Sequence, residues 1–98
     1  MKLEDLPREE RPRERFLKYG STSLSNEELL SLILKTGTRG KSVKELSLEV
    51  LKEIEDMTNL QNMTVEQFSR IKGIGTVKAI ELMASIELGK RIFLQNKQ

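Results

Sequence analysis

Apolar residues recur every three or four positions along most of this chain, the spacing that gathers them on one face of an α-helix. No stretch of useful length alternates apolar and polar residues as a half-buried strand does, so no sheet is predicted. The pattern predicts an all-α fold, a small bundle of about five helices. The expected helices cover residues 12–19, 26–36, 43–54, 65–71 and 76 to beyond 93.

Three of these helices begin with the pattern of a capping box. In this motif a Ser or Thr hydroxyl accepts from an early helical N–H, and a Glu or Gln three residues later reaches back. The three pairs are Ser25 with Glu28, Ser42 with Glu45, and Thr64 with Gln67. Pro12 suits the first turn of the first helix, and Gly20 and Gly37 are placed to end the first and second helices.

The last predicted helix is apolar over most of its circumference. Its polar stripe is narrow and consists of Lys78, Glu81, Ser85 and Gly89. A helix of this kind packs against neighbours on several sides. We therefore expect it to lie at the centre of the bundle.

The order of helices and glycines repeats within the chain. One helix, the loop Gly37-x-x-Gly40 and a second helix come first, and a connector at residues 59–63 follows. A helix, the turn Gly73-x-Gly75 and another helix complete the chain. Two such units are expected to pack with approximate twofold symmetry around one core.

The composition fits one small globular domain and excludes several kinds of chemistry. The chain has 98 residues, 37% of them hydrophobic and 33% charged, enough for one small core. It has no Cys and no His, which excludes disulfides, the usual zinc sites and catalysis by Ser-His or Cys-His pairs. Aromatic residues make up only 4%, which excludes base stacking as a main mode of binding. We predict no catalytic residue, no metal site and no cofactor.

The sequence contains no signal for a membrane or for export. No apolar run approaches the roughly 20 residues of a membrane-spanning helix, and the N-terminus has no signal-peptide core. A soluble cytoplasmic protein with no membrane partner is expected.

Charged residues are segregated along the chain, although the net charge is only +2. Residues 70–98 contain six basic and two acidic residues, and residues 35–41 contain three basic residues and no acidic one. Residues 43–66 reverse this balance, with two basic and six acidic residues. Such segregation fits a basic face that binds an anionic partner, or ordinary solvated helix surfaces.

The segment IKGIGTVKA, residues 71–79, is the strongest candidate for a binding site. Gly73 and Gly75 permit positive φ values and a close approach of the backbone, and Ile74 between them is expected to point inward. The amides that follow would then face outward at a helix N-terminus. Unsatisfied donors and the helix dipole make such an end attractive to a phosphate.

The candidate phosphate-binding residues combine backbone amides with positive side chains. They are Lys72, Gly73, Gly75, Thr76, Val77 and Lys78, with Arg70 nearby. Backbone donors do not read base identity, so binding to DNA phosphates would be largely independent of sequence and sensitive to salt. The alternative is a helical corner whose glycines serve geometry alone. The pattern apolar-x-Gly-apolar-Gly-x-x-Lys-Ala between two helices is the helix-hairpin-helix pattern, which favours phosphate binding.

The earlier loop resembles a P-loop only at its end, Gly40-Lys41-Ser42. A P-loop needs four residues between its glycines, whereas two separate Gly37 from Gly40, and Lys35 stands where the first glycine should be. A helix rather than a strand precedes it, so nucleotide hydrolysis is not predicted. The loop could hold a second phosphate or be a capped loop with solvated charges. The candidate residues are Arg39, Gly40, Lys41 and Ser42.

Three segments in order resemble the N-terminal region of RadC-like bacterial proteins, a family long labelled as DNA repair proteins. They are RPRERFL at 11–17, LSNEELLSLILKTGTRGKSV at 24–43 and IKGIGTVKA at 71–79. The resemblance runs from about Leu6 to about Arg91. It implies one clear and one degenerate helix-hairpin-helix unit, similar to domain 2 of RuvA.

In that family a JAB/MPN metallopeptidase-like domain follows, with a His-x-His and Asp zinc signature. This chain has no His, so no catalytic or zinc residue is carried over. The intermixed acidic and basic residues at 1–10 predict a mobile or loosely docked arm. The resemblance implies a helix-hairpin-helix domain at 11–92 and the start of a linker at 93–98. The chain looks like one part of a longer protein.

The expected function is a non-enzymatic, sequence-independent DNA-binding module of a DNA repair-associated protein, with duplex or branched DNA as its partner. The first alternative is a module that docks a protein partner or its own C-terminal JAB/MPN domain. The acidic residues 45–66 and apolar residues near Phe93 would then matter more than the glycine turn. The second alternative is a scaffold for chemistry in that other domain.

Overall fold

The computed structural model describes residues 11–95, and their regular structure is helical, which confirms the all-α class. The predicted arm at residues 1–10 and residues 96–98 of the predicted linker lie outside the described residues. The only β-type pairing between residues 11 and 95 is an isolated bridge from Thr38 to Lys41. The α-helices are α1 (Pro12–Tyr19), α2 (Asn26–Leu34), α3 (Val43–Ile54), α4 (Val65–Ser69) and α5 (Thr76–Gln95), and the 3-10 helices are η3 (Ser21–Ser23) and η4 (Met57–Asn62).

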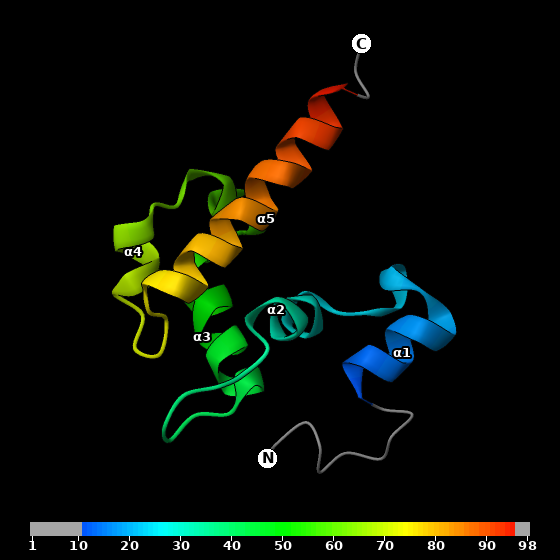
Figure 1. Cartoon of the computed structure of the whole chain (residues 1–98), viewed down its shortest axis with the longest axis horizontal. Coiled ribbons are helices and arrows are strands. Elements are labelled where there is room, and N and C mark those ends of the chain that lie inside the picture. The colour runs from blue at the N-terminus through cyan, green and yellow to red at the C-terminus, as the bar shows by residue number, and fades with distance from the viewer. Residues whose placement is uncertain (1–10, 96–98) are drawn as a thin grey trace.

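One apolar core joins α2, α3, α4 and the first half of α5. In Figure 1, α1 lies at one side of the molecule and α4 at the other, with α2, α3 and the start of α5 between them. On α3 the apolar residues Val43, Leu46, Val50 and Ile54 recur at helical spacing, and all four are buried. The core residues are Leu30, Leu34, Val43, Leu46, Val50, Phe68, Ile71, Ile74, Ala79 and Leu82.

Two of the three capping boxes form completely, at Ser25 before α2 and at Thr64 before α4. The box at Ser42 forms only by half. Its hydroxyl accepts from the amide of Glu45 at 3.1 Å, but the Glu45 carboxylate turns to the Ser42 hydroxyl, 3.2 Å away, and not to the Ser42 amide. The predicted helix start is therefore correct, whereas the predicted reciprocal contact is not.

The helix ends differ from the expectation at one glycine. Gly20, with φ of +88°, ends α1 as predicted. Lys35, with φ of +69°, ends α2, so the expectation that Gly37 stops this helix was wrong. Gly37 has another task, since a Cβ there would lie 2.2 Å from the carbonyl oxygen of Lys41. It allows the tight Thr38–Lys41 bridge.

The predicted central position of α5 was also wrong. Only Ala79 and Leu82 of this helix are buried. The helix has 20 residues and would be about 30 Å long, and its second half extends beyond the other helices in Figure 1. Of its apolar residues in that half, Ile86 packs against the core and the others are exposed. Exposed apolar residues of α5 are Val77, Ile80, Leu88, Ile92, Phe93 and Leu94.

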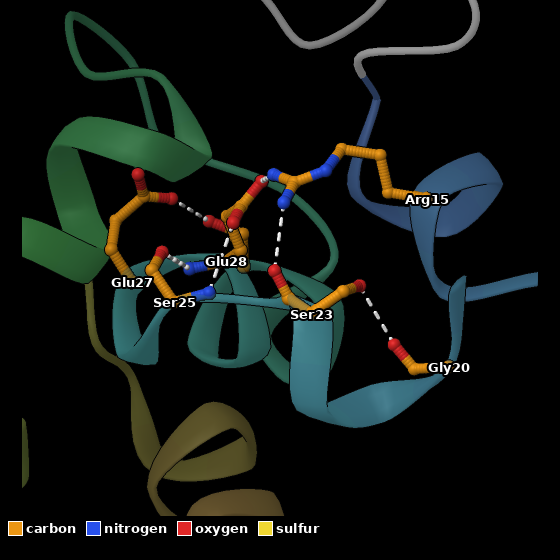
Figure 2. Close-up of polar contacts among 7 residues, drawn as sticks. Arg15, Gly20, Ser23, Ser25, Glu27 and Glu28 are labelled. Atoms are coloured by element: carbon orange, nitrogen blue, oxygen red, sulfur yellow. Dashed lines mark hydrogen bonds and ion pairs between the residues drawn. The ribbon is translucent and has the colours of Figure 1, made fainter. Parts of the chain in front are cut away.

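A polar cluster fixes α1 and η3 to the start of α2 (Figure 2). The guanidinium of Arg15 donates to the Glu28 carboxylate and, at 2.7 Å, to the carbonyl of Ser23. Glu28 also accepts from the amide of Ser25 at 2.9 Å as part of the capping box. Partial burial raises the pKa of Glu28, but the Ser25 hydrogen bonds and Arg15 outweigh it, so the pKa of Glu28 lies below its ordinary value.

A pair of buried hydroxyls joins α2 to α3. Ser31 and Ser47 are 1% and 0% exposed, and their Oγ atoms lie 3.0 Å apart. Each hydroxyl has one proton, so two arrangements are possible: Ser47 donates to the carbonyl of Val43 and Ser31 donates to Ser47, or Ser31 donates to Glu27 and Ser47 donates to Ser31. Because each hydroxyl has partners, the pair can be buried without the cost of an unsatisfied polar group. The small side chains also let the two helices lie close together.

Candidate nucleic-acid interface

The two glycine loops that the sequence indicated lie side by side. In the structure the first loop covers residues 35–42 and the second covers residues 70–75. Both are found at the same end of the molecule in Figure 1. Gly73 has φ of +104°, and a Cβ there would lie 2.8 Å from Cγ2 of Thr38 and 2.9 Å from Cδ1 of Leu46. Only glycine suits this conformation and this contact. Gly73 therefore lets the second loop pack on the first loop and on α3.

The side chain of Ile74 points inward, as predicted. It is 2% exposed and belongs to the core, together with Ile71 at 5%. The amide of Ile74 donates to the carbonyl of Ile71 at 2.9 Å and closes the turn. This anchor fixes the direction in which the next residues leave the turn and begin α5.

The N-terminus of α5 is open to solvent. The first backbone hydrogen bond of this helix runs from the amide of Ala79 to the carbonyl of Gly75, at 3.0 Å. The amides of Gly75, Thr76 and Val77 therefore precede the regular ladder of hydrogen bonds. These three residues are exposed, and a Cβ at Gly75 would meet no atom within 4 Å. The three residues that carry these amides are therefore open to solvent.

This N-terminus also differs electrostatically from those of the other α-helices between residues 11 and 95. Acidic residues in a first turn compensate the positive end of the helix dipole. Each of α1 to α4 has one or two of them there, whereas α5 has none. Lys72 stands close before it in sequence and is exposed. The N-terminus of α5 is therefore the most favourable helix end for an anion in the described structure.

The ammonium of Lys78 does not extend toward solvent beside these amides. It donates to the carbonyls of Leu34 at 2.9 Å and Thr36 at 2.5 Å, and to the hydroxyl of Thr36 at 3.0 Å. Leu34, the last residue of α2, and Thr36 therefore occupy this cation, which the sequence placed among the phosphate contacts. No sequence signal marked Leu34 or Thr36 as its partners.

The first loop presents its candidate residues unequally. Arg39 and Gly40 are exposed, whereas Lys41 is partly buried and its Nζ lies 3.8 Å from the carboxylate of Glu49. The hydroxyl of Ser42 is engaged with Glu45 as the cap of α3. Among the four candidate residues Arg39 is thus the exposed charged side chain, and the Ser42 hydroxyl serves the helix cap.

The described residues show neither a metal site nor a membrane span. In residues 11–95 no group of three or more acidic side chains is placed to hold a metal ion. Over the same range no helix is both long and apolar enough to cross a bilayer.

The fold and the candidate site together define a small all-α protein with two helix–loop–helix units whose loops meet at one end. A family model described as UPF0758 N-terminal matches residues 3–80, and the chain belongs to this family. The predicted membership of the RadC-like proteins is thereby confirmed.

The chain is similar to several curated UPF0758 proteins of bacteria. It is 49% identical over 92 residues to one from Bacillus licheniformis, covering 94% of this chain and 41% of the relative. It is 48% identical over 92 residues to the UPF0758 protein YsxA of Bacillus subtilis, with 94% and 40% covered, and 44% identical over 98 residues to one from Alkaliphilus oremlandii, with 99% and 42% covered. The chain thus spans about two-fifths of the length of these relatives. No solved structure matches it significantly.

Proposed function

We propose that this chain is a non-enzymatic DNA-binding module that holds the phosphate backbone independently of base sequence. A phosphate would accept hydrogen bonds from the amides of Gly75, Thr76 and Val77, and Lys72 would add positive charge. The observation that supports this best is the N-terminus of α5. It is exposed, it begins at a glycine with open space before it, and its first turn has no acidic residue.

The first loop gives the module a second point of contact with the backbone. Arg39 and the amide of Gly40 lie on an exposed part of this loop, and Lys41 adds charge behind them. The packing of Gly73 against Thr38 keeps both loops at the same end of the molecule. With so few phosphate contacts, we expect a dissociation constant of about 10⁻⁴ to 10⁻⁶ M at physiological salt.

The test compares two charge reversals in a titration of a labelled DNA duplex followed by fluorescence anisotropy. Lys72→Glu is expected to weaken binding strongly, because it places a negative charge beside the phosphate site. Lys52→Glu is the matched control, since Lys52 is exposed in the last turn of α3, far from the N-terminal end of that helix and its loop. Equal losses in the two variants would count against a defined site at the glycine turn.

A second experiment tests independence from sequence. Two duplexes of equal length and unrelated sequence should bind with the same affinity, and both affinities should fall as salt is raised. A large preference for one duplex would indicate readout of base edges or of DNA shape, and would contradict binding through phosphate contacts alone.

A second candidate function is docking of the remaining part of the longer protein, and a specific observation favours it. Leu88, Ile92 and Leu94 on the second half of α5 are 61%, 57% and 62% exposed. A groove of about 390 Å³ runs along the same helix, lined by apolar residues that include Met63, Ile80 and Met83. Exposed apolar patches of this kind mark interaction surfaces.

The occupant that fits is the domain that makes up the rest of the relatives' length, which the family resemblance describes as JAB/MPN metallopeptidase-like. In the longer protein, changing Leu88 and Ile92 to Ser should make the segment between the two parts more susceptible to limited proteolysis. Leu48→Ser is the control, because Leu48 is also exposed, at 49%, but lies on α3. An unchanged proteolysis pattern in the double variant would contradict this docking.

A further inference from the structure

Lys78 connects the start of α5 to the end of α2. Its Nζ lies within hydrogen-bond distance of three acceptors, which are two carbonyl oxygens and one hydroxyl of residues 34 and 36. The last carbonyls of a helix have no partner within the helix and form the negative end of its dipole. An ammonium group has three donors, so Lys78 can serve Leu34, the last residue of α2, and Thr36 beyond it with a charge of the favourable sign, although the Leu34 carbonyl also accepts from the Thr36 amide.

A second contact one turn further along α5 holds the same segment. Glu81 accepts from Nζ of Lys35 at 2.9 Å. Lys35 itself adopts φ of +69°, a conformation that non-glycine residues rarely adopt. Residues 34–36 are thus held by two side chains of α5, at the point where the chain leaves α2 and enters the first loop.

This segment determines where the first loop lies relative to the glycine turn. Thr38 follows two residues after Thr36 and contacts Gly73. Lys78 follows five residues after Gly73 and returns to Thr36. The two loops are therefore joined on both sides, by a packing contact at Thr38 and by hydrogen bonds at Thr36.

We propose that Lys78 is a positioning residue that fixes the first loop beside the N-terminus of α5, and that its ammonium is not one of the phosphate contacts. This inference rests on the proposed function for its effect on DNA, but its effect on the free protein is independent of DNA. Removal of the ammonium would leave the carbonyls of Leu34 and Thr36 without this partner and would free the loop to move.

The experiment compares Lys78→Met with Lys72→Met, two variants that remove the same charge and keep the aliphatic stem. Without DNA, Lys78→Met should lower Tm by about 4–8 °C, because its contacts are partly exposed and their loss should equal that of one ordinary hydrogen bond in a domain of this size. It should also shift the amide signals of residues 34–41. Lys72→Met should leave both unchanged.

With a DNA duplex, the two variants should differ in the salt dependence of binding. Each phosphate contact contributes about 0.9 to the slope of log affinity against log salt, so Lys72→Met should reduce the slope by about one. Lys78→Met should weaken binding at each salt concentration but keep the slope. Lys78→Arg retains hydrogen-bond donors, so it should recover most of the Tm that Lys78→Met loses. If Lys78→Met does not fold, Lys78→Arg should still fold.

The inference is overturned if Lys78→Met has the Tm and the residue 34–41 amide signals of the parent chain. It is equally overturned if this variant reduces the slope as Lys72→Met does, or if Lys78→Arg recovers none of the lost Tm. If the parent chain does not bind DNA, the proposed function fails, while the Tm and the amide signals still decide the role of Lys78.

Discussion

Gly73 offers a sharp test of how the two loops are held together. We consider Gly73→Ala, which adds one methyl group where φ is +104°. The left-handed conformation costs an L-residue about 1–2 kcal/mol. The new methyl group would also lie 2.8 Å from Cγ2 of Thr38 and 2.9 Å from Cδ1 of Leu46. Leu46 is 0% exposed and cannot withdraw into solvent.

Overpacking of this kind costs about 1–3 kcal/mol, so the two effects together remove about 2–5 kcal/mol. Native domains are stable by only about 5–15 kcal/mol, so this loss is a large fraction of the total. In a domain of this size each kcal/mol corresponds to about 4–8 °C in Tm. Gly73→Ala should therefore lower Tm by at least about 8 °C.

The assay is thermal unfolding followed by circular dichroism, with Gly75→Ala as the matched control. Gly75 has no positive φ, and a Cβ there would meet no atom within 4 Å. Its substitution removes only the preference for glycine over alanine at a helix start, about 1 kcal/mol or less. A Gly73→Ala chain with Tm within about 2 °C of the parent would refute the reasoning, since the shift expected from the cited costs is far larger. An equal loss of Tm in Gly73→Ala and Gly75→Ala would refute it as well.

Further predictions concern pH and the core. Since the pKa of Glu28 is lowered in the folded chain, this group contributes stability above its ordinary pKa of 4.5, and the contribution is lost as pH falls through the lowered value. Glu28→Gln should therefore be less stable than the parent near neutral pH, and the difference in stability should shrink in acid. Urea unfolding from pH 7 to pH 3 measures this difference. A difference that stays constant would contradict a contribution from the ionised Glu28 carboxylate. Phe68 is 0% exposed, so Phe68→Ala should cost about 3–5 kcal/mol in the same assay, and a loss below about 1 kcal/mol would show that the core closes around the gap.

The sequence predicted those structural features that depend on residues close together in the chain. Local signals predicted that helices begin after Ser25 and Thr64, that Ile74 points inward and that α1 ends at Gly20. The structure confirms these predictions. The resemblance of three ordered segments to RadC-like proteins predicted the family correctly.

The rest depends on contacts between distant parts of the chain. Nothing local indicates that the ammonium of Lys78 would reach Thr36, 42 residues earlier, or that Thr38 would lie against Gly73. The sequence likewise did not indicate the positive φ of Lys35, a residue whose ammonium is bound by Glu81 of α5. The apolar residues around α5 predicted a helix that packs on several sides. The sequence could not show that many of these residues are exposed in the folded chain.

The most direct measurement is a titration of the isotope-labelled chain with a short DNA duplex at two salt concentrations, following the backbone amide signals. Phosphate binding at the glycine turn predicts shifts centred on Gly75, Thr76 and Val77, with further shifts at Arg39 and Gly40, all smaller at the higher salt concentration. The absence of shifts at low salt, or shifts confined to the second half of α5, would contradict phosphate binding at the glycine turn.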